Sequence, residues 1–344
     1  MFRAWLRAPG GAFVARLAAA AGLAALISVA VAQAQEARFF RIGTGPIGGA
    51  YFTIGGMLAN AISSPPGARP CDKGGSCGVP GLVAVAQSTQ GSVENVEAIA
   101  SGALESALVQ ADIVYWAYHG TGLFQDQGPL DNLRAIANLF PSTVHIVVRG
   151  DSFITDISEL RGKRISLGEE GSGTLVNARS ILASYGISET DFEPVYEMPG
   201  PASDLLAEGE IDAFLVVGGV PVSTIVDLSA RVPIRLLPIN GTVGEEIKSF
   251  HPFFSEAAIN AGEYTNVGHT ATVGLSTQWI VSAEADEELV YELTKAMWHE
   301  RNLALYQDGH PEGKRIRLDS ALERVAIPLH PGAARFYKEQ GIER

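Results

Sequence analysis

Three short segments combine glycine with hydroxyl-bearing residues where a strand is expected to give way to a helix. They are residues 43–51 (GTGPIGGAY), 88–92 (STQGS) and 168–174 (GEEGSGT). The first N–H groups of a helix have no internal partners and carry a partial positive charge, and glycine lets a ligand approach the main chain closely. Three such corners facing one cleft would bind a small carboxylate without many Lys or Arg side chains. The alternative interpretation is that each corner only caps a helix.

Two catalytic patterns match by letters but lack their structural context. Residues 43–48 have the G-x-G-x-x-G spacing of a dinucleotide site, but no acid stands at residues 63–66, where the ribose-binding carboxylate would be expected. Residues 74–78 match G-x-S-x-G around Ser76, but their Pro-rich flanks do not suit the strand and helix of a nucleophile elbow. The seven His residues are scattered, with no H-E-x-x-H motif. The sequence therefore predicts no nucleotide cofactor and no metal.

Alternating strands and helices are expected to position the three corners. Apolar runs predict strands at residues 38–43, 82–87, 107–110, 145–149, 164–168, 211–217, 234–238 and 272–282. Helical spacing predicts helices at residues 51–63, at 92–101 with Ser92 as N-cap, from 113–118 onward, at 174–185 and as one long helix at 284–308. This alternation is typical of an α/β protein with parallel sheets. Ligands of open α/β sheets bind at the carboxyl ends of the strands, where the corners lie.

Composition narrows the class of protein. The chain has 344 residues, of which 47% are hydrophobic and 18% charged, so it is large enough for about two globular domains and is neither disordered nor collagen-like. Its net charge is −13 and no basic stripe is present, which argues against a nucleic-acid partner. The net charge does not fix the charge of a small ligand, because a local site can oppose it.

In the first 34 residues, basic, apolar and small residues follow one another as they do in a secretory signal peptide. Arg3, Arg7 and Arg16 precede an apolar run at residues 17–32, and the small residues that follow predict cleavage after Ala34. A membrane anchor is the alternative, but this run is 16 residues long, whereas a spanning helix needs about 18–20. We therefore expect a protein exported to the periplasm.

Cys71 and Cys77 are the chain's two cysteines, and they enclose a flexible Asp-Lys-Gly-Gly-Ser segment. An oxidising compartment favours a disulfide between them. Such a small ring would contribute roughly 2 kcal/mol to the free energy of unfolding. Two free thiols are the alternative. A metal site is not predicted, because no second Cys or His pair stands at ligand spacing.

Several longer segments occur in an order and spacing typical of one family. They are IGTG (42–45), GAY (49–51), GSVEN (91–95), QAD (110–112), DISELRGKR (156–164), GSGT (171–174), IDAF (211–214), VGGVP (217–221) and HPGA (330–333). In these segments the chain resembles the TAXI family of TRAP-transporter solute-binding proteins, the extracytoplasmic receptors of ion-driven uptake systems. The resemblance extends over nearly the whole chain after the signal.

The resemblance implies an α/β chain with the two-lobed type II periplasmic-binding-protein fold and a ligand cleft between the lobes. Residues 35–143 would form the first part of lobe I, residues 144–276 lobe II, and residues 277–344 a return strand and C-terminal helices, mainly in lobe I. The strands at 145–149 and 272–282 would cross the hinge. Ligand binding would shift an open–closed equilibrium toward the closed state.

The resemblance also implies a set of ligand-binding residues. They are Thr44, Gly49, Ala50, Tyr51, Ser92, Asn95 and Gln110 in lobe I, and Ser172, Gly173, Thr174, Asp212 and Gly218 in lobe II. The family often has Thr where Ala50 stands, so donation there would come from the main-chain N–H. Asp212 could equally be a structural acceptor. Arg149 is a candidate counter-ion that could equally face solvent.

By the same resemblance the ligand would be a small organic anion, either an acidic amino acid such as glutamate or a C4–C5 dicarboxylate. The partners would be the small and large membrane subunits of a TRAP transporter, separate or fused, and no catalysis, cofactor or nucleic acid is expected. Two alternatives stay open. One is a secreted α/β hydrolase with Ser76 or Ser172 as nucleophile, which requires a His within hydrogen-bond reach. The other is a ligand-sensing periplasmic protein.

Overall fold

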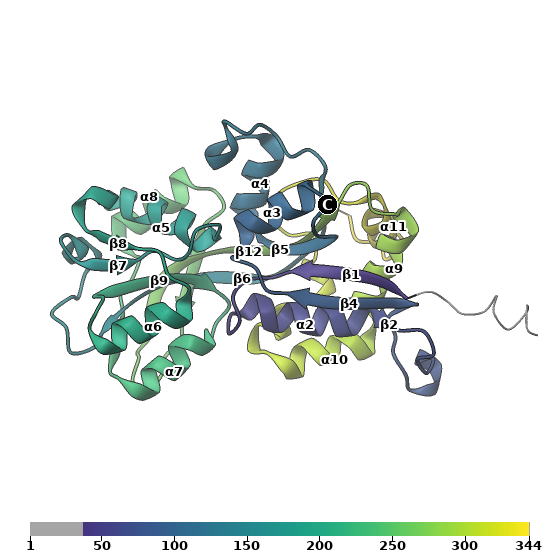
Figure 1. Cartoon of the computed structure of the whole chain (residues 1–344), viewed down its shortest axis with the longest axis horizontal. Coiled ribbons are helices and arrows are strands. Elements are labelled where there is room, and N and C mark those ends of the chain that lie inside the picture. Colours follow the sequence, from purple (N-terminus) through teal and green to yellow (C-terminus); the bar gives the residue numbers. More distant parts are fainter. Residues whose placement is uncertain (1–36, 344) are drawn as a thin grey trace, which may run out of the picture.

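Two long strands pass through the middle of the molecule and join its two halves (Figure 1). The computed structural model describes residues 37–343, so the predicted signal peptide and its cleavage site after Ala34 lie outside the described residues. Strand β6 (Leu133–Arg149) pairs antiparallel with β12 (Thr270–Ser282). At one end β12 continues into the sheet of one half, and at the other end β6 continues into the sheet of the second half. We call these halves lobe I and lobe II.

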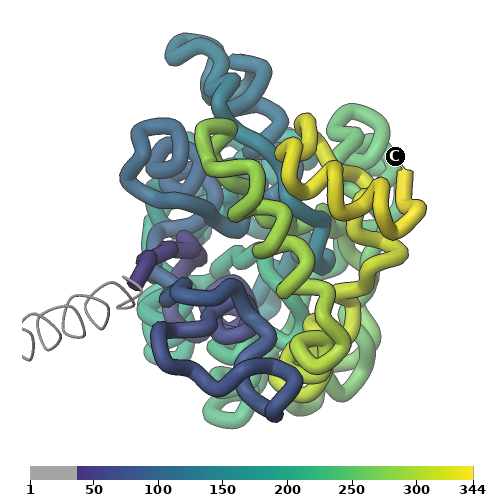
Figure 2. Tube along the Cα trace, turned by 90° about the vertical axis from the view of Figure 1, so that its right-hand side faces the viewer, coloured from purple at the N-terminus to yellow at the C-terminus, as the bar shows by residue number. Residues whose placement is uncertain are grey.

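Lobe I contains the N-terminal strands and the C-terminal helices. Its strands, in the order in which they pair toward β12, are β4 (Leu82–Gln87), β1 (Arg38–Gly43) and β5 (Ser106–Gln110). Its helices are α2 (Ala50–Ile62), α3 (Ser92–Ala100), α4 (Ala111–His119), α9 (Glu287–Met297), α10 (Glu300–Gly309) and α11 (Pro331–Glu339). Figure 2 looks at this lobe from outside and shows the C-terminal segment lying across it beside the N-terminal elements. One core therefore joins the two ends of the described chain, and it includes Phe40, Leu58 and Trp279.

Lobe II is formed by the middle of the chain. Its strands are β9 (Ala213–Gly218), β7 (Arg164–Ser166) and β8 (Glu193–Val195), with β10 (Ile234–Leu236) on β6 and β11 (Ser255–Ile259) on β12. Its helices are α5 (Gly173–Ser184), α6 (Pro199–Glu208), α7 (Ser223–Arg231) and α8 (Gly241–Phe250). In Figure 1 helices cover both faces of the sheet in each lobe. A separate core fills lobe II, with Ile165, Leu182 and Leu215 among its members.

The predicted α/β class with two lobes is confirmed, but the prediction of parallel sheets was only partly right. β1 runs parallel to β4 and β5, and β7 runs parallel to β8 and β9. β6 and β12 are antiparallel to each other and to the strands beside them. The sheet is mixed because these two strands cross between the lobes in opposite directions. The strand predicted at residues 145–149 is the end of the much longer β6.

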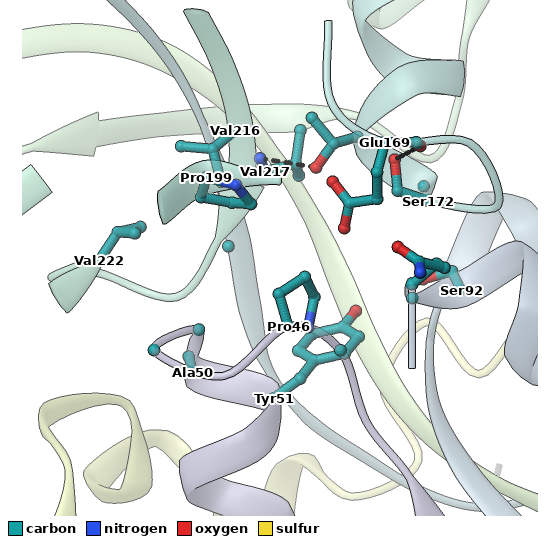
Figure 3. A pocket seen from close by; sticks show the side chains of 18 of the residues that line it. Pro46, Ala50, Tyr51, Ser92, Glu169, Ser172, Pro199, Val216, Val217 and Val222 are labelled. Carbon is teal, nitrogen blue, oxygen red and sulfur yellow. Dashed lines mark hydrogen bonds between the residues drawn. The ribbon is translucent and has the colours of Figure 1, made fainter. Parts of the chain in front are cut away.

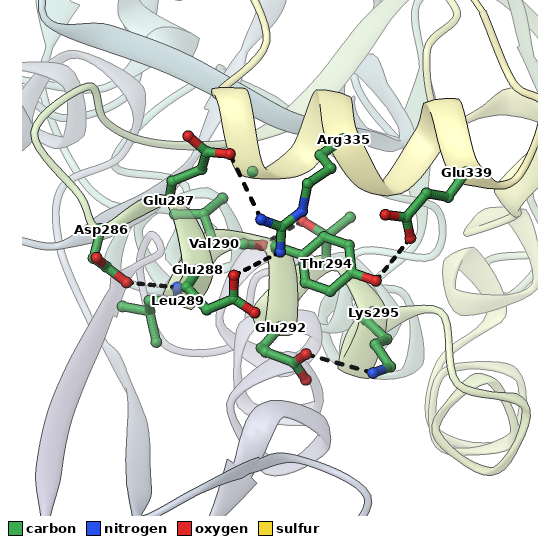
Figure 4. A network of polar contacts seen from close by, with 12 residues as sticks. Asp286, Glu287, Glu288, Leu289, Val290, Glu292, Thr294, Lys295, Arg335 and Glu339 are labelled. Carbon is green, nitrogen blue, oxygen red and sulfur yellow. Dashed lines mark hydrogen bonds and ion pairs between the residues drawn. The ribbon is translucent and has the colours of Figure 1, made fainter.

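The single long helix predicted at residues 284–308 is wrong, because the chain breaks between α9 and α10. Trp298 is buried and donates its Nε1–H to the Tyr337 hydroxyl of α11 at 3.0 Å. His299 then begins α10 by accepting the N–H of Arg301 at 3.3 Å. Figure 4 shows how α11 lies against α9, with Arg335 reaching the acids of the first turn of α9. Tertiary contacts, rather than local propensity, thus end the helix.

Cys71 and Cys77 form the predicted disulfide. The ring begins in the turn η1 (Cys71–Lys73), between the short strands β2 (Ser63–Ser64) and β3 (Val79–Pro80). The remaining 3-10 turns are η2 (Gly122–Phe124), η3 (Ile157–Leu160), η4 (Glu189–Asp191), η5 (Pro311–Arg315) and η6 (Leu318–Ser320). Among residues 37–343, the helices are all too short or too polar to cross a membrane.

Adjacent glycines of α2 should respond oppositely to substitution by Ala. Gly56 is exposed and a Cβ there would contact nothing within 4 Å, so Gly56→Ala should raise the free energy of unfolding by about 0.5–1 kcal/mol. A Cβ on Gly55 would lie 2.4 Å from Thr44 Cγ2, so Gly55→Ala should lower it by about 1–3 kcal/mol. Urea denaturation measures both changes. Equal effects of the two substitutions would contradict this packing.

Reduction of the disulfide should lower the melting temperature and leave ligand binding in the cleft expected between the lobes unaffected. The closed ring is small, so its loss should cost roughly 2 kcal/mol. The ring lies at the outer end of lobe I, beyond β4 and β2 in Figure 1. Calorimetry of the oxidised and reduced protein measures the shift. A large change in ligand affinity on reduction would contradict this placement.

Candidate functional site

A cavity of about 70 Å³ lies between the lobes (Figure 3). A single ordered water needs only about 10–15 Å³ by this measure, so the cavity has room for a small organic molecule. Nine of the twelve predicted ligand-binding residues line it: Gly49, Ala50, Tyr51, Ser92, Gln110, Ser172, Gly173, Thr174 and Gly218. Residues from all three glycine-bearing corners are among them. The corners therefore converge, and a binding role for these residues stays a prediction.

The first corner directs main-chain N–H groups into the cavity at the start of α2. Gly49 is the N-cap, and the first main-chain bond of the helix joins the Thr53 N–H to the Gly49 oxygen. The N–H groups of Ala50 and Tyr51 therefore have no partner inside the helix. The Tyr51 hydroxyl accepts a hydrogen bond from Thr277 Oγ1 at 3.3 Å. Burial raises the pKa of Tyr51 to about 12, so the phenol is a neutral donor at physiological pH.

The corner at residues 168–174 provides the start of α5 in lobe II. Ser172 is the N-cap, since its Oγ accepts the Leu175 N–H at 3.1 Å, and it also donates to the main-chain oxygen of Glu169 at 2.6 Å. Thr174 Oγ1 accepts the N–H of Val217 at 3.2 Å. Both hydroxyls thus hold the corner together. The N–H groups of Gly173 and Thr174 precede the first bonded N–H of α5 and lack a partner inside the helix.

At the corner formed by residues 88–92, the N-cap and the bonding partner of the helix start both differ from the prediction. Gly91, with φ of 125°, is the N-cap of α3, and Ser92 is the first helical residue rather than the cap. The Ser92 hydroxyl accepts the N–H of Gln110 at 3.1 Å. The N–H groups of Val93 and Glu94 both donate to the oxygen of Gly171 in lobe II at 3.1 Å. This helix start therefore binds the opposite lobe.

Other contacts show that the lobes are closed on each other. Asn177 of α5 donates its Nδ2–H to Asp112 of α4 at 2.7 Å. The N–H of Val220, just after β9, donates to Glu312 Oε1 in η5 at 3.0 Å. Gly173 packs so tightly against lobe I that an added Cβ would lie 1.9 Å from Gln110 Oε1. Both sides of the cavity contribute to this closed interface.

Thr44 and Asn95 were predicted to contact ligand, but neither lines the cavity. Thr44 is buried and its Oγ1 donates to the oxygen of Gln87 at 2.7 Å. Asn95 is buried and donates its Nδ2–H groups to the oxygens of Thr44 and Leu108 at 2.7 and 2.8 Å. Both side chains join the ends of neighbouring strands, so they support the corner instead of facing a ligand.

Asp212 and Arg149 also lie outside the cavity lining. Asp212 accepts three hydrogen bonds from Arg164, from its main-chain N–H at 2.8 Å, from Nε at 3.1 Å and from Nη2 at 2.9 Å, and the side-chain bonds lower the pKa of Asp212. Asp212 is thus the structural acceptor that the sequence left open. Arg149 pairs with Asp151 at 2.8 Å and donates to the oxygen of Ala207. It is not a counter-ion for the cavity.

Sequence reasoning missed Glu169, whose carboxylate points into the cavity in Figure 3. Its side chain is deeply buried, and burial raises its pKa to about 7. The sequence gives no signal for its burial, because an acid in a glycine-rich loop is ordinarily exposed. The apolar part of the lining was missed too, and it includes Pro46, Val216 and Val222. None of the described residues that line the cavity is Lys, Arg or His.

A Ser–His pair does not form within residues 37–343. Ser76 is hydrogen-bonded to the Ser63 oxygen and the Gly78 N–H, and Ser172 to the main chain of its own corner, so neither contacts a His. His299 Nε2 lies 3.6 Å from Cys71 Sγ, which brings a His and two Cys together. Both sulfurs belong to the disulfide, so they offer no thiolate to a metal.

The interlobe Asp112 should make stability depend on pH. Burial raises its pKa from 3.8 to about 6, so the folded protein holds this proton longer than the unfolded chain does. Its contribution to the free energy of unfolding therefore falls, by at most about 3 kcal/mol, as pH rises from about 4 to about 6. Asp112→Asn keeps an oxygen for Asn177 and should remove this dependence.

Urea denaturation at a series of pH values measures the difference between wild type and Asp112→Asn. The difference should grow between about pH 4 and 6 and stay level above that range. Asp126→Asn, at an exposed position, controls for the loss of one formal charge. Parallel curves for wild type and Asp112→Asn would contradict the burial of an ionisable carboxyl at the interface.

Several solved structures are similar to the chain over most of its length. A protein of Bordetella bronchiseptica RB50 is 15% identical with a TM-score of 0.51, over 89% of this chain and 82% of that chain. The periplasmic aliphatic sulphonate binding protein SsuA from Escherichia coli is 15% identical with a TM-score of 0.46, over 89% of each chain. An ancestral arginine-binding protein bound to arginine is 14% identical with a TM-score of 0.45, over 79% of this chain and 97% of that chain.

Identities this low concern the fold alone. The two-lobed type II periplasmic-binding-protein fold expected from the sequence is confirmed, with β6 and β12 as the crossing strands and the cavity between the lobes. The family model gives the broader relationship. Residues 42–341 match the model of the NMT1-like family, and the chain therefore belongs to that family.

Proposed function

We propose that the protein is a periplasmic solute-binding receptor of the TAXI type, which captures a small carboxylate between its lobes and delivers it to the membrane subunits of a TRAP transporter. The observation that carries this proposal is the cavity, where helix starts from opposite lobes direct N–H groups at one space. Ala50 and Tyr51 offer theirs from lobe I. Gly173 and Thr174 offer theirs from lobe II.

A carboxylate held by both helix starts would link ligand binding to closure. Each start carries a partial positive charge, and an anion placed between the two is attracted to both only when the lobes are together. The ligand thus has a higher affinity for the closed state, which is what shifts such an equilibrium. We propose the division predicted from the sequence, with residues 35–143 and 277–344 in lobe I and residues 144–276 in lobe II.

The electrostatics of the lining favour some carboxylates over others. No Lys, Arg or His among the described residues lines the cavity, so any negative charge there is held by main-chain N–H groups and neutral donors. Acidic amino acids such as glutamate and C4–C5 dicarboxylates are the ligands implied by the family resemblance. A ligand with a single net negative charge, or none, suits this lining better than a dianion.

A receptor role is favoured over a hydrolase, and a transport assay separates it from a ligand sensor. A hydrolase would need its nucleophile activated by a base, and Ser76 and Ser172 are both hydrogen-bonded to main-chain groups instead. A ligand sensor would use the same cavity and the same closure. Uptake driven by an ion gradient in vesicles that contain the transporter subunits distinguishes a receptor from a sensor.

Gly173→Ala should weaken ligand binding while the protein stays folded. The added methyl group would overlap Gln110, which forces the amide into the cavity or the lobes apart. We expect affinity to fall at least about tenfold. Ligands are first found by a thermal-shift screen of C3–C6 carboxylates and amino acids, since a ligand that binds only the folded protein raises its melting temperature.

Calorimetric titration then compares the affinity of wild type with that of Gly173→Ala. Gly56→Ala is the matched control, because it adds the same methyl group at an exposed position away from the cavity. Its affinity should equal that of wild type. A screen in which no carboxylate or amino acid stabilises the protein would argue against the proposed function, as would unchanged affinity in Gly173→Ala.

A further inference from the structure

Glu169 places a carboxylate without a cationic partner inside the interlobe cavity. Its side chain is 7% exposed, and Figure 3 shows the carboxylate in the space between the lobes. Its main-chain oxygen is fixed by the N–H of Ser172 at 3.2 Å and the Ser172 hydroxyl at 2.6 Å. The side chain therefore leaves a rigid turn and points at whatever the cavity holds.

The surroundings of Glu169 provide no cation. Of the described residues that line the cavity, Tyr51 from α2 is the other titratable group, and it stays neutral at physiological pH. Beyond the lining, α3 contributes Glu94, whose carboxylate accepts the N–H of Gln90 at 2.7 Å, and α4 contributes the buried Asp112. The neighbour in sequence, Glu170, is another acid. Isolated carboxylates are costly to bury, so a partner from outside the chain is expected.

We propose that the ligand carries a protonated amine, which donates to the Glu169 carboxylate while main-chain N–H groups bind the ligand's own carboxylate. The ligand class is then a zwitterionic α-amino acid. This inference rests on the proposed function and chooses between the two ligand classes that it leaves open. Glu169 is the residue that determines the preference for amino acids over dicarboxylates.

The position of Glu169 in the corner at residues 168–174 matches the shape of an α-amino acid. Glu169 lies three residues before Ser172, the N-cap of α5, and the free N–H groups of Gly173 and Thr174 follow directly. An acceptor for an ammonium group and donors for a carboxylate thus lie side by side in one loop. In an α-amino acid these two groups are attached to the same carbon atom, so one loop can bind both.

The charge of Glu169 distinguishes an amino-acid ligand from a dicarboxylate ligand. A dicarboxylate would add negative charge beside Glu169, so it could bind only to the protonated form of Glu169, whose O–H would donate a hydrogen bond to it. An ammonium group has the opposite effect, because it favours the ionised carboxylate. Burial raises the pKa of Glu169 in the free protein to about 7, so at about pH 6 its carboxyl group is mostly protonated. Amino-acid binding should then release a proton, whereas dicarboxylate binding should exchange almost none.

The experiment uses pairs of ligands that differ only by the amine. Glutamate is compared with glutarate, and valine with 3-methylbutanoate, by calorimetric titration of the full mature protein. Titrations at about pH 6 in buffers of different ionisation enthalpy measure the protons exchanged. We expect the amino acid of at least one pair to bind at least about tenfold more tightly than its partner, with release of a proton.

Glu169→Gln keeps the shape of the side chain and removes its charge. It should lower amino-acid affinity by about 10- to 100-fold and abolish proton release, while dicarboxylate affinity stays equal or rises. Glu170→Gln, an exposed position in the same loop, is the matched control and should bind like wild type. Melting temperatures of both variants check folding, and proton exchange of wild type remains decisive if Glu169→Gln does not fold.

Three results would overturn the inference. They are partners without the amine that bind as tightly as the amino acids, absence of proton release on amino-acid binding, and unchanged amino-acid affinity in Glu169→Gln. Each of these leaves a receptor that binds carboxylates, so the proposed function would stand. Failure of every carboxylate and amino acid to bind wild type would overturn both.

Discussion

The structure depends on the need of buried N–H groups at helix starts to find acceptors. Helices α2, α3 and α5 all begin at the junction of the lobes, at residues that are buried or half-buried. The start of α3 is satisfied by the Gly171 oxygen from the opposite lobe. The starts of α2 and α5 keep free N–H groups that face the cavity. One of these helix starts thus holds the lobes together, and the other two leave a site for an anion.

Much of the fold could be predicted from the sequence, because strands and corners have local signals. Strands β1 and β4 match their predicted bounds, and α2 and α5 begin within one residue of theirs. The break at Trp298 could not be predicted, because it depends on a hydrogen bond to Tyr337, far away in the sequence. The length of β6 was missed for a similar reason, since its pairing with β12 and β9 joins distant segments.

The sequence predicted that the three glycine-bearing corners would lie together, but it did not predict which side chains face the cavity. Thr44, Asn95 and Asp212 are polar residues near strand ends, but all three bind other parts of the chain. A sequence does not show whether a polar side chain faces a ligand or supports the main chain, because the same residue types do both. Glu169 is the opposite case, a residue that was not predicted to face a ligand but does line the cavity. Only the fold shows that this acid in a loop is buried there.

The hinge strands have a consequence for how such a molecule moves. β6 and β12 are bonded to each other from Leu133 and Ser282 to Thr143 and Gly274, with irregularities at Thr277/Gln278 and Trp279/Ile280. Sliding one strand along the other would break this ladder and turn side chains to the wrong face, whereas flexing the pair preserves it. This pair of strands therefore resists shear more than bending, so we expect the lobes to separate by flexing of β6 and β12 and not by sliding.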